Sequence, residues 1–202
     1  MKLYDNATAP NPRRVRIFVA EKGLEIPLEA VDIQRKENLT PEFLEINPLG
    51  AVPVLETDAG EHIAESLAIC RYLEALHPQP ALFGTLPEEK GRVEMWIHRV
   101  EFEFVQRVFL CFQNTHDYMK GRMPQVPEFG ELSRERAQKF LDLLDAQLAT
   151  ADFVAGDGFS MADISLLCGL EFGRVAGIRA ADQHKAIARW HEQVAARPSA
   201  KA

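Results

Sequence analysis

Short apolar runs alternate with a helical pattern at the beginning of the chain. Residues 2–6 and 27–33 have the apolar content of strands, and between them apolar positions recur at the spacing of a helix face. Asn11 followed by Pro12 predicts the N-cap and the first position of that helix, and Gly23 predicts its end. A strand, a helix and a strand in this order predict a right-handed crossover with a parallel strand pair.

A hairpin and a second helix are expected next. Thr40 before Pro41 predicts a short capped helix, and residues 52–56 and 62–64 predict two strands joined by a tight turn. Ser66 then opens a helix whose apolar positions share one face. Together these elements describe an α/β unit that resembles a thioredoxin fold, which usually carries a cis-proline at the start of its third strand.

The pattern of the remaining chain is helical only. We therefore predict a thioredoxin-like α/β domain over residues 1–80, a linker over 81–90 and an all-α domain over 91–202. The helices of that domain are expected at residues 92–118, 133–148, 160–173 and 183–196. Ser160 and Asp163 have the spacing of a capping box at the start of the third of these helices.

Composition and charge exclude several classes of protein. The 202 residues carry a net charge of −7, which argues against a nucleic-acid or anionic-membrane partner, because both reward clustered Lys and Arg. No apolar run approaches the roughly 18 residues of a membrane span, and the first residues lack the apolar stretch of a signal peptide. The scattered Cys70, Cys111 and Cys168 predict packed free thiols in a reducing compartment, so we expect a cytoplasmic protein.

One proline interrupts an apolar run that otherwise has the composition of a buried strand. Pro53 cannot donate to a sheet ladder, so its position needs a reason. We predict a cis Val52-Pro53 bond in a turn that leaves the Val52 backbone free to pair with a peptide-like ligand. The alternative is a trans proline on an edge strand.

Three motifs resemble those of the cytosolic glutathione transferase family. They are Asn47-Pro48-Leu49-Gly50-Ala51-Val52-Pro53-Val54-Leu55, Ala64-Glu65-Ser66-Leu67-Ala68-Ile69 and Gly158-Phe159-Ser160-Met161-Ala162-Asp163. The resemblance implies an enzyme that conjugates the glutathione thiolate to a small hydrophobic electrophile, a detoxification reaction. It further implies glutathione as co-substrate without a prosthetic group, a helical domain that lines the electrophile pocket, and a homodimer.

The resemblance also implies which residues bind glutathione. Val52, before Pro53, would pair with the cysteinyl backbone of the tripeptide. The Ser66 hydroxyl and the helix N-terminus would take the γ-glutamyl carboxylate, and Glu65 would take the ammonium group. Asn38 would contact the glycyl end. A plain helix cap at Ser66 and an ordinary polar loop residue at Asn38 are the alternatives.

The donor to the thiolate is the least determined part of the predicted site. A cysteine thiol with a pKa near roughly 8.5 is only a few per cent ionised at neutral pH, so a donor must favour the anion. Ala9 stands where a Ser or Cys is expected, and Tyr4 lies too early in the strand. Thr8-Ala9-Pro10-Asn11 resembles the bacterial and fungal Nu-like branch, in which an Asn side chain faces the sulfur. We therefore favour Asn11, with the Thr8 hydroxyl as the alternative, although Asn11 could be only a helix cap.

Other chemistries find little support. The chain has no Cys-x-x-Cys and no G-x-G-x-x-G motif, and its six histidines have no companion ligands of metal-site type, so we predict no metal site. Phe102, Phe104, Phe109 and Phe112 are expected to be mostly core, although some of them could line the electrophile pocket with His116 and Tyr118. The competing functions are a glutathione-dependent peroxidase or disulfide reductase and a non-catalytic binding or regulatory protein, which the alanine at position 9 keeps open.

Overall fold

The computed structural model describes residues 1–202, and the chain folds into two compact units. The first contains Met1–Ala81 together with Pro198–Ala202, and the second contains Leu82–Arg197. The short tail groups with the first unit because Arg13 Nη2 donates a hydrogen bond to the Ala200 carbonyl, at 2.8 Å.

A four-stranded mixed sheet forms the centre of the first unit. Its strands are β1 (Lys2–Asp5), β2 (Leu28–Ala30), β3 (Val54–Glu56) and β4 (His62–Ala64), in the order β2-β1-β3-β4. β1 and β2 are parallel and β3 and β4 form an antiparallel hairpin, which confirms the predicted parallel pair and the predicted hairpin. The strands expected at 27–33 and 52–56 are shorter than predicted. β3 starts only after Pro53, because proline has no N–H for the ladder.

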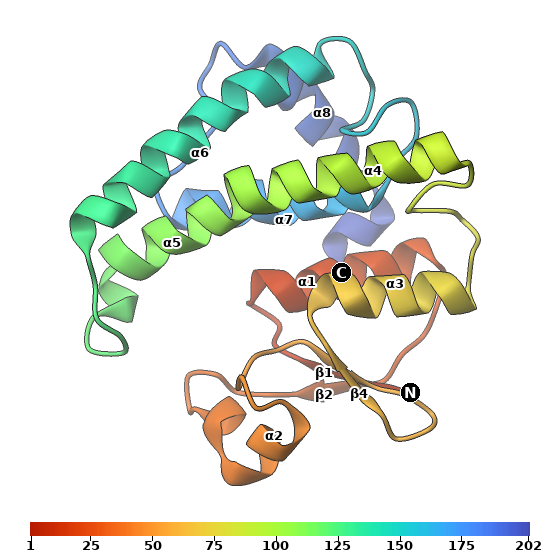
Figure 1. Ribbon diagram of the computed structural model, residues 1–202, viewed down its shortest axis with the longest axis vertical. Coiled ribbons are helices and arrows are strands. Elements are labelled where there is room, and N and C mark those ends of the chain that lie inside the picture. Colours follow the sequence, from red (N-terminus) through yellow and green to blue (C-terminus); the bar gives the residue numbers. More distant parts are fainter. The chain divides into compact units, whose positions relative to one another are not determined.

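Three helices pack on this sheet. Helices α1 (Pro10–Glu21) and α3 (Ser66–Leu76) lie along one face, and α2 (Pro41–Ile46) lies on the other side (Figure 1). The α2 side has a core of Tyr4, Val31, Phe43 and Val54. The Tyr4 and Phe43 rings meet edge to face, with centroids 6.0 Å apart. The cap predicted at Thr40 is confirmed, since its side chain accepts a hydrogen bond from the Phe43 N–H.

The predicted start of α1 is wrong. The helix begins at Pro10, with Ala9 as an N-cap that makes no side-chain capping bond, so Asn11 lies inside the first turn. Ala9 has an extended backbone, with φ −82° and ψ 137°, and the fixed φ of proline suits the first helical position. Asn11 is therefore not the helix cap that the sequence pattern suggested.

The second unit is all-helical, as predicted, but two helix boundaries were wrong. Its helices are α4 (Pro87–Arg99), α5 (Gln106–Thr115), α6 (Pro127–Leu148), α7 (Met161–Val175) and α8 (Lys185–Ala195). The helix expected over 92–118 starts earlier, inside the segment expected to be a linker, and residues 100–105 between α4 and α5 form a π-helix. No helix of the chain has the length and apolar content to cross a bilayer.

Helix α6 starts before the predicted Ser133 and includes a glycine that had suggested a loop. A Cβ on Gly130 would lie 2.5 Å from Thr115 Cγ2. The glycine therefore permits close approach of α5 and α6. Short 3-10 turns complete the chain at Glu37–Leu39, Asp117–Met119 and Pro198–Lys201.

A buried carboxylate organises the start of α7. Asp163 is fully buried; its Oδ2 accepts hydrogen bonds from the Ser160 N–H and hydroxyl, which confirms the predicted capping box. Its Oδ1 accepts bonds from the Val154 N–H at 2.9 Å and the Trp190 Nε1–H at 2.8 Å. Burial raises the pKa of Asp163 to about 6, against the lowering effect of these four bonds. The three cysteines are free and buried, as predicted.

Candidate functional site

The register of the sheet brings three loop segments to one edge. Tyr4 pairs with Val54, and Val54 pairs with Ala64. Tyr4, Val54 and Ala64 therefore lie side by side on three neighbouring strands. β1 ends one residue after Tyr4 and β4 ends at Ala64, whereas β3 begins at Val54. The segments around Asn6, Pro53 and Glu65 therefore emerge at the same edge, although they are far apart in sequence.

The first segment contains the predicted cis peptide. The Val52-Pro53 bond is cis, which confirms that expectation. The Val52 N–H and C=O have no hydrogen-bond partner within the chain, and the residue is half-buried. An extended peptide can pair with such a free strand-end backbone.

Two asparagines brace the loop that leads to this turn. Asn47 is buried; its Nδ2 donates to the Ala51 carbonyl at 2.8 Å, and its Oδ1 accepts from the Leu49 N–H at 3.2 Å. Asn38 Nδ2 donates to the Gly50 carbonyl at 2.6 Å. Gly50 has φ +59°, a conformation that glycine adopts without penalty. Asn38 thus holds the loop, and its second N–H and its buried Oδ1 form no hydrogen bond within the chain. Sequence reasoning missed the bracing role of Asn47.

Glu65 and Ser66 form the second segment, at the N-terminus of α3. Glu65 has φ +67° and ψ 116°, which is strained for a residue with a Cβ and costs about 1–3 kcal/mol. Strain of this kind persists mainly at functional sites. The Glu65 side chain is exposed and makes no capping bond, so its carboxylate can receive a cation.

The Ser66 hydroxyl already has a partner in the chain. Arg14 Nη1 on α1 donates a hydrogen bond to Ser66 Oγ at 3.0 Å, and both residues are buried. The guanidinium therefore adds a positive charge to the positive end of the α3 dipole. Sequence reasoning missed Arg14. Arg14 precedes the buried Phe18 by four residues, so both lie on the same face of the helix. This spacing was the signal that could have indicated a buried Arg14.

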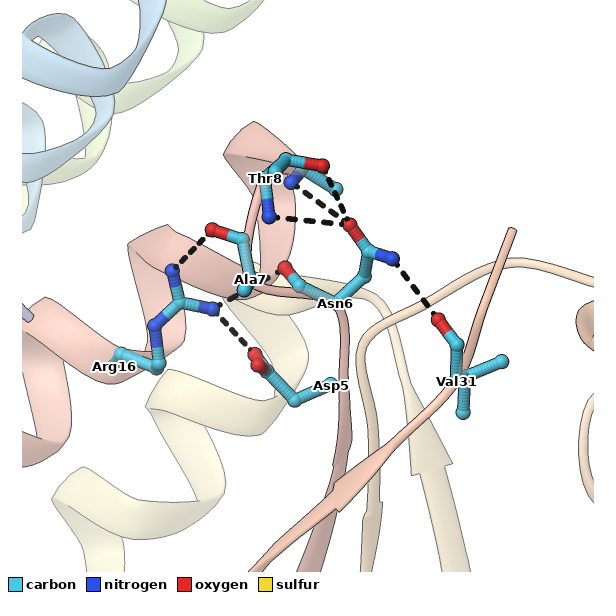
Figure 2. A network of polar contacts seen from close by, with 7 residues as sticks. Asp5, Asn6, Ala7, Thr8, Arg16 and Val31 are labelled. Carbon is cyan, nitrogen blue, oxygen red and sulfur yellow. Dashed lines mark hydrogen bonds and ion pairs between the residues drawn. The ribbon is translucent and has the colours of Figure 1, made fainter. Parts of the chain in front are cut away.

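The third segment is the loop between β1 and α1 (Figure 2). The Thr8 hydroxyl donates to Asn6 Oδ1 at 3.0 Å, so its proton is used within the loop. The Asn11 side chain is half-buried and forms no hydrogen bond within the chain. Pro10 and Pro12 lack an N–H, so Asn11 has the only backbone donor among the first three positions of α1. Asn11 thus offers two unused donors, one from its amide side chain and one from its backbone.

Tyr4 points away from this edge, as its early position predicted. Its hydroxyl donates to Glu56 Oε2 at 3.0 Å. That bond and the neighbouring Lys2 ammonium lower the pKa of Glu56. Tyr4 is therefore part of the α2 side of the sheet.

The helical unit contains an aromatic cluster, which consists of Phe109, Phe112, Phe172, His116 and Tyr118. The rings of Phe109 and Phe172 have centroids 4.8 Å apart, and those of Phe112 and His116 are 4.6 Å apart. Of the four phenylalanines expected to be mostly core, only Phe104 is fully buried. Phe109 and Phe112 are half-buried and Phe102 is 53% exposed, so the expectation is wrong for most of the set.

Known proteins share this architecture of a mixed thioredoxin-like sheet and an all-helical unit. The chain matches the sequence models "Glutathione S-transferase, N-terminal domain" over residues 8–76 and "Glutathione S-transferase, C-terminal domain" over residues 105–198. It is 36% identical over 208 aligned residues to Glutathione S-transferase 2 of Saccharomyces cerevisiae. This alignment covers 100% of the present chain and 88% of the yeast protein.

Two solved structures extend the comparison. Gtt2 from Saccharomyces cerevisiae has a TM-score of 0.94 at 36% identity, over 100% of this chain and 99% of that one. A glutathione S-transferase domain-containing protein from Marinobacter aquaeolei VT8 has the same TM-score and identity, over 98% and 99% of the two chains. The chain belongs to the glutathione S-transferase family.

Proposed function

We propose that this protein binds glutathione at the shared sheet edge and conjugates its thiolate to a small hydrophobic electrophile. One observation carries the proposal. Three groups suited to the three chemical parts of the tripeptide emerge at one edge: a free strand-end backbone at Val52, a positive helix end at Ser66, and unused amide donors at Asn11.

The binding roles follow from the chemistry of each group. The Val52 backbone, held beside Pro53, pairs with the cysteinyl N–H and C=O as a neighbouring strand would. The α3 N-terminus and Ser66 take the γ-glutamyl carboxylate, and the exposed Glu65 carboxylate takes the ammonium group. Asn38 places its remaining N–H toward the glycyl carboxylate while it holds Gly50.

In the proposed mechanism Asn11 stabilises the thiolate. Its side-chain amide and backbone N–H donate to sulfur, and the positive end of the α1 dipole favours the anion. An amide cannot accept the proton, so the proton leaves to solvent and the role of Asn11 is electrostatic. Thr8 is the weaker alternative, because its hydroxyl must first give up the bond to Asn6.

The thiolate then attacks the electrophilic carbon. For an aryl halide a sulfur–carbon bond forms and the halide leaves with the electron pair of the broken bond. The proposal includes a cytoplasmic homodimer that uses glutathione as co-substrate without a prosthetic group.

Affinity and turnover measurements test this function. We expect retention on immobilised glutathione and turnover of 1-chloro-2,4-dinitrobenzene. Turnover of a hydroperoxide or of hydroxyethyl disulfide, but not of the aryl halide, would instead indicate the peroxidase or disulfide reductase. Binding without turnover of any of these compounds would leave a non-catalytic binding protein.

A further inference from the structure

The carboxamide of Asn6 connects the ends of three elements of the first unit (Figure 2). Its Oδ1 accepts hydrogen bonds from the Thr8 N–H at 3.2 Å, the Thr8 hydroxyl at 3.0 Å and the Ala9 N–H at 3.2 Å. Its Nδ2 donates to the Val31 carbonyl, just beyond β2, at 2.9 Å. Asn6 itself follows the last residue of β1. One side chain therefore ties β1 and β2 to the start of α1.

These bonds hold the backbone immediately before α1. Ala9 has no side-chain acceptor for the helix amides, so it cannot cap the helix itself. The Asn6 oxygen instead holds the N–H groups of Thr8 and Ala9 outside the helix, in the manner of an Asx turn. The helix then starts at Pro10, and Asn11 occupies its second position with its donors unused.

We propose that Asn6 is a positioning residue that acts through Asn11. This inference rests on the proposed function. Asn6 does not touch the sulfur; it fixes the turn that aims the Asn11 donors, and it engages the Thr8 hydroxyl so that Thr8 does not compete as donor.

The role of Asn6 differs from general support of the loop. Arg16 holds the same loop by other bonds, since its guanidinium pairs with the Asp5 carboxylate and donates to the Ala7 carbonyl at 3.1 Å. It also donates to the Asn6 backbone carbonyl at 3.3 Å, a bond that survives replacement of the Asn6 side chain. In an Asn6→Ala protein the loop therefore keeps this anchor, and the Ala9 N–H keeps its 3.3 Å bond to the carbonyl of residue 6. What is lost are the side-chain bonds to Thr8, Ala9 and Val31.

A double-mutant cycle tests the coupling between the two residues. In Asn6→Ala we expect kcat to fall about fivefold or more while the KM for glutathione changes about twofold or less, because small displacements of a donor weaken transition-state contacts. The pKa of the bound glutathione thiol, followed by thiolate absorbance, should rise. In the Asn11→Ala background the same change should have almost no further effect on kcat or on this pKa. Equal losses in both backgrounds would overturn the inference.

The helical unit offers a matched control at the start of α4. Glu89 Oε2 accepts bonds from the Thr85 N–H at 2.9 Å, the Thr85 hydroxyl at 2.6 Å and the Leu86 N–H at 3.1 Å, the same donor pattern as at Asn6. Glu89→Ala should lower the melting temperature and leave the pKa of the bound thiol unchanged. If Glu89→Ala raises that pKa as much as Asn6→Ala does, the effect is a general loss of stability and the inference fails.

A second variant serves if Asn6→Ala does not fold. Asn6→Asp keeps the acceptor for the turn but loses the donor to Val31 and places a negative charge near the thiolate. We expect a folded protein in which the added charge raises the thiol pKa in both backgrounds, so only the part of the kcat loss that disappears in the Asn11→Ala background is assigned to positioning. If Asn11→Ala lowers kcat but neither Asn6 variant does, the inference fails while the proposed function stands. A wild-type protein that binds no glutathione would overturn both.

Discussion

Arg14 on α1 donates a hydrogen bond to the hydroxyl of Ser66 at the start of α3, with Nη1 and Oγ 3.0 Å apart and both residues buried. The bond links the two helices that cover one face of the sheet, and it places a cation beside a helix N-terminus. Ser66 thus has a structural partner and a proposed ligand at the same time. The proposed γ-glutamyl carboxylate would meet a hydroxyl whose orientation Arg14 already sets.

Ser66→Ala separates these two contributions. We expect a several-fold higher KM for glutathione, because the proposed carboxylate contact is lost. The free energy of unfolding should fall by about 1–3 kcal/mol, because Arg14 loses this acceptor in a buried setting. Steady-state kinetics and denaturant unfolding measure the two effects. An unaltered KM would contradict the γ-glutamyl assignment even if stability falls.

Asn11→Ala tests the thiolate donor. We expect turnover to fall about tenfold or more with nearly unchanged glutathione affinity, the pattern of a lost transition-state contact. Thr8→Val is the matched comparison and should have the smaller effect, since the Thr8 proton is already engaged with Asn6. Unchanged turnover in Asn11→Ala would exclude Asn11 as the donor.

Two substitutions at Glu65 distinguish its charge from its backbone. Glu65→Gln keeps the strained backbone and should raise the KM for glutathione without a change in stability. Glu65→Gly should raise the KM similarly but keep or increase stability, because relief of about 1–3 kcal/mol of strain offsets the extra chain entropy of glycine. A Glu65→Gln protein with wild-type KM would show that the carboxylate does not bind the ammonium group.

Asp163 predicts a pH dependence of stability. Burial raises its pKa in the folded state to about 6 from an ordinary value of 3.8, so the folded state binds the proton more tightly than the unfolded state. This contribution to stability is fully present below about pH 4, declines as the pH rises through about 6, and amounts to roughly 3 kcal/mol in total.

A comparison with Asp163→Asn isolates the pH-dependent contribution of Asp163 to the free energy of unfolding. The variant should be less stable, because an amide nitrogen cannot accept the bonds from Ser160. The difference in unfolding free energy between the two proteins, measured from pH 4 to 7, should change across this window. A constant difference would show that Asp163 does not titrate there.

The proposed homodimer is tested most directly by sedimentation. We expect the mass of a dimer at micromolar concentration, and a monomer would refute the proposal.

Local sequence signals predicted features of both units. The cap at Thr40, the capping box from Ser160 to Asp163 and the cis bond before Pro53 each involve residues close together in sequence, where side-chain chemistry acts on the neighbouring backbone. The periodicity of apolar residues was enough to separate an α/β unit from an all-helical one.

Contacts between distant segments produced what the sequence pattern missed. The Asn6 side chain donates to the Val31 carbonyl 25 positions away, and Gly130 permits the close approach of α5 and α6. The sequence pattern assigned no role to Arg14, because its hydrogen bond to Ser66 joins residues that are 52 positions apart. Periodicity reports which face of an element is buried, but the partner that the face meets is set by the packing of the whole unit. The candidate glutathione residues could therefore be named from motifs, whereas the residues that orient them became visible only in the folded chain.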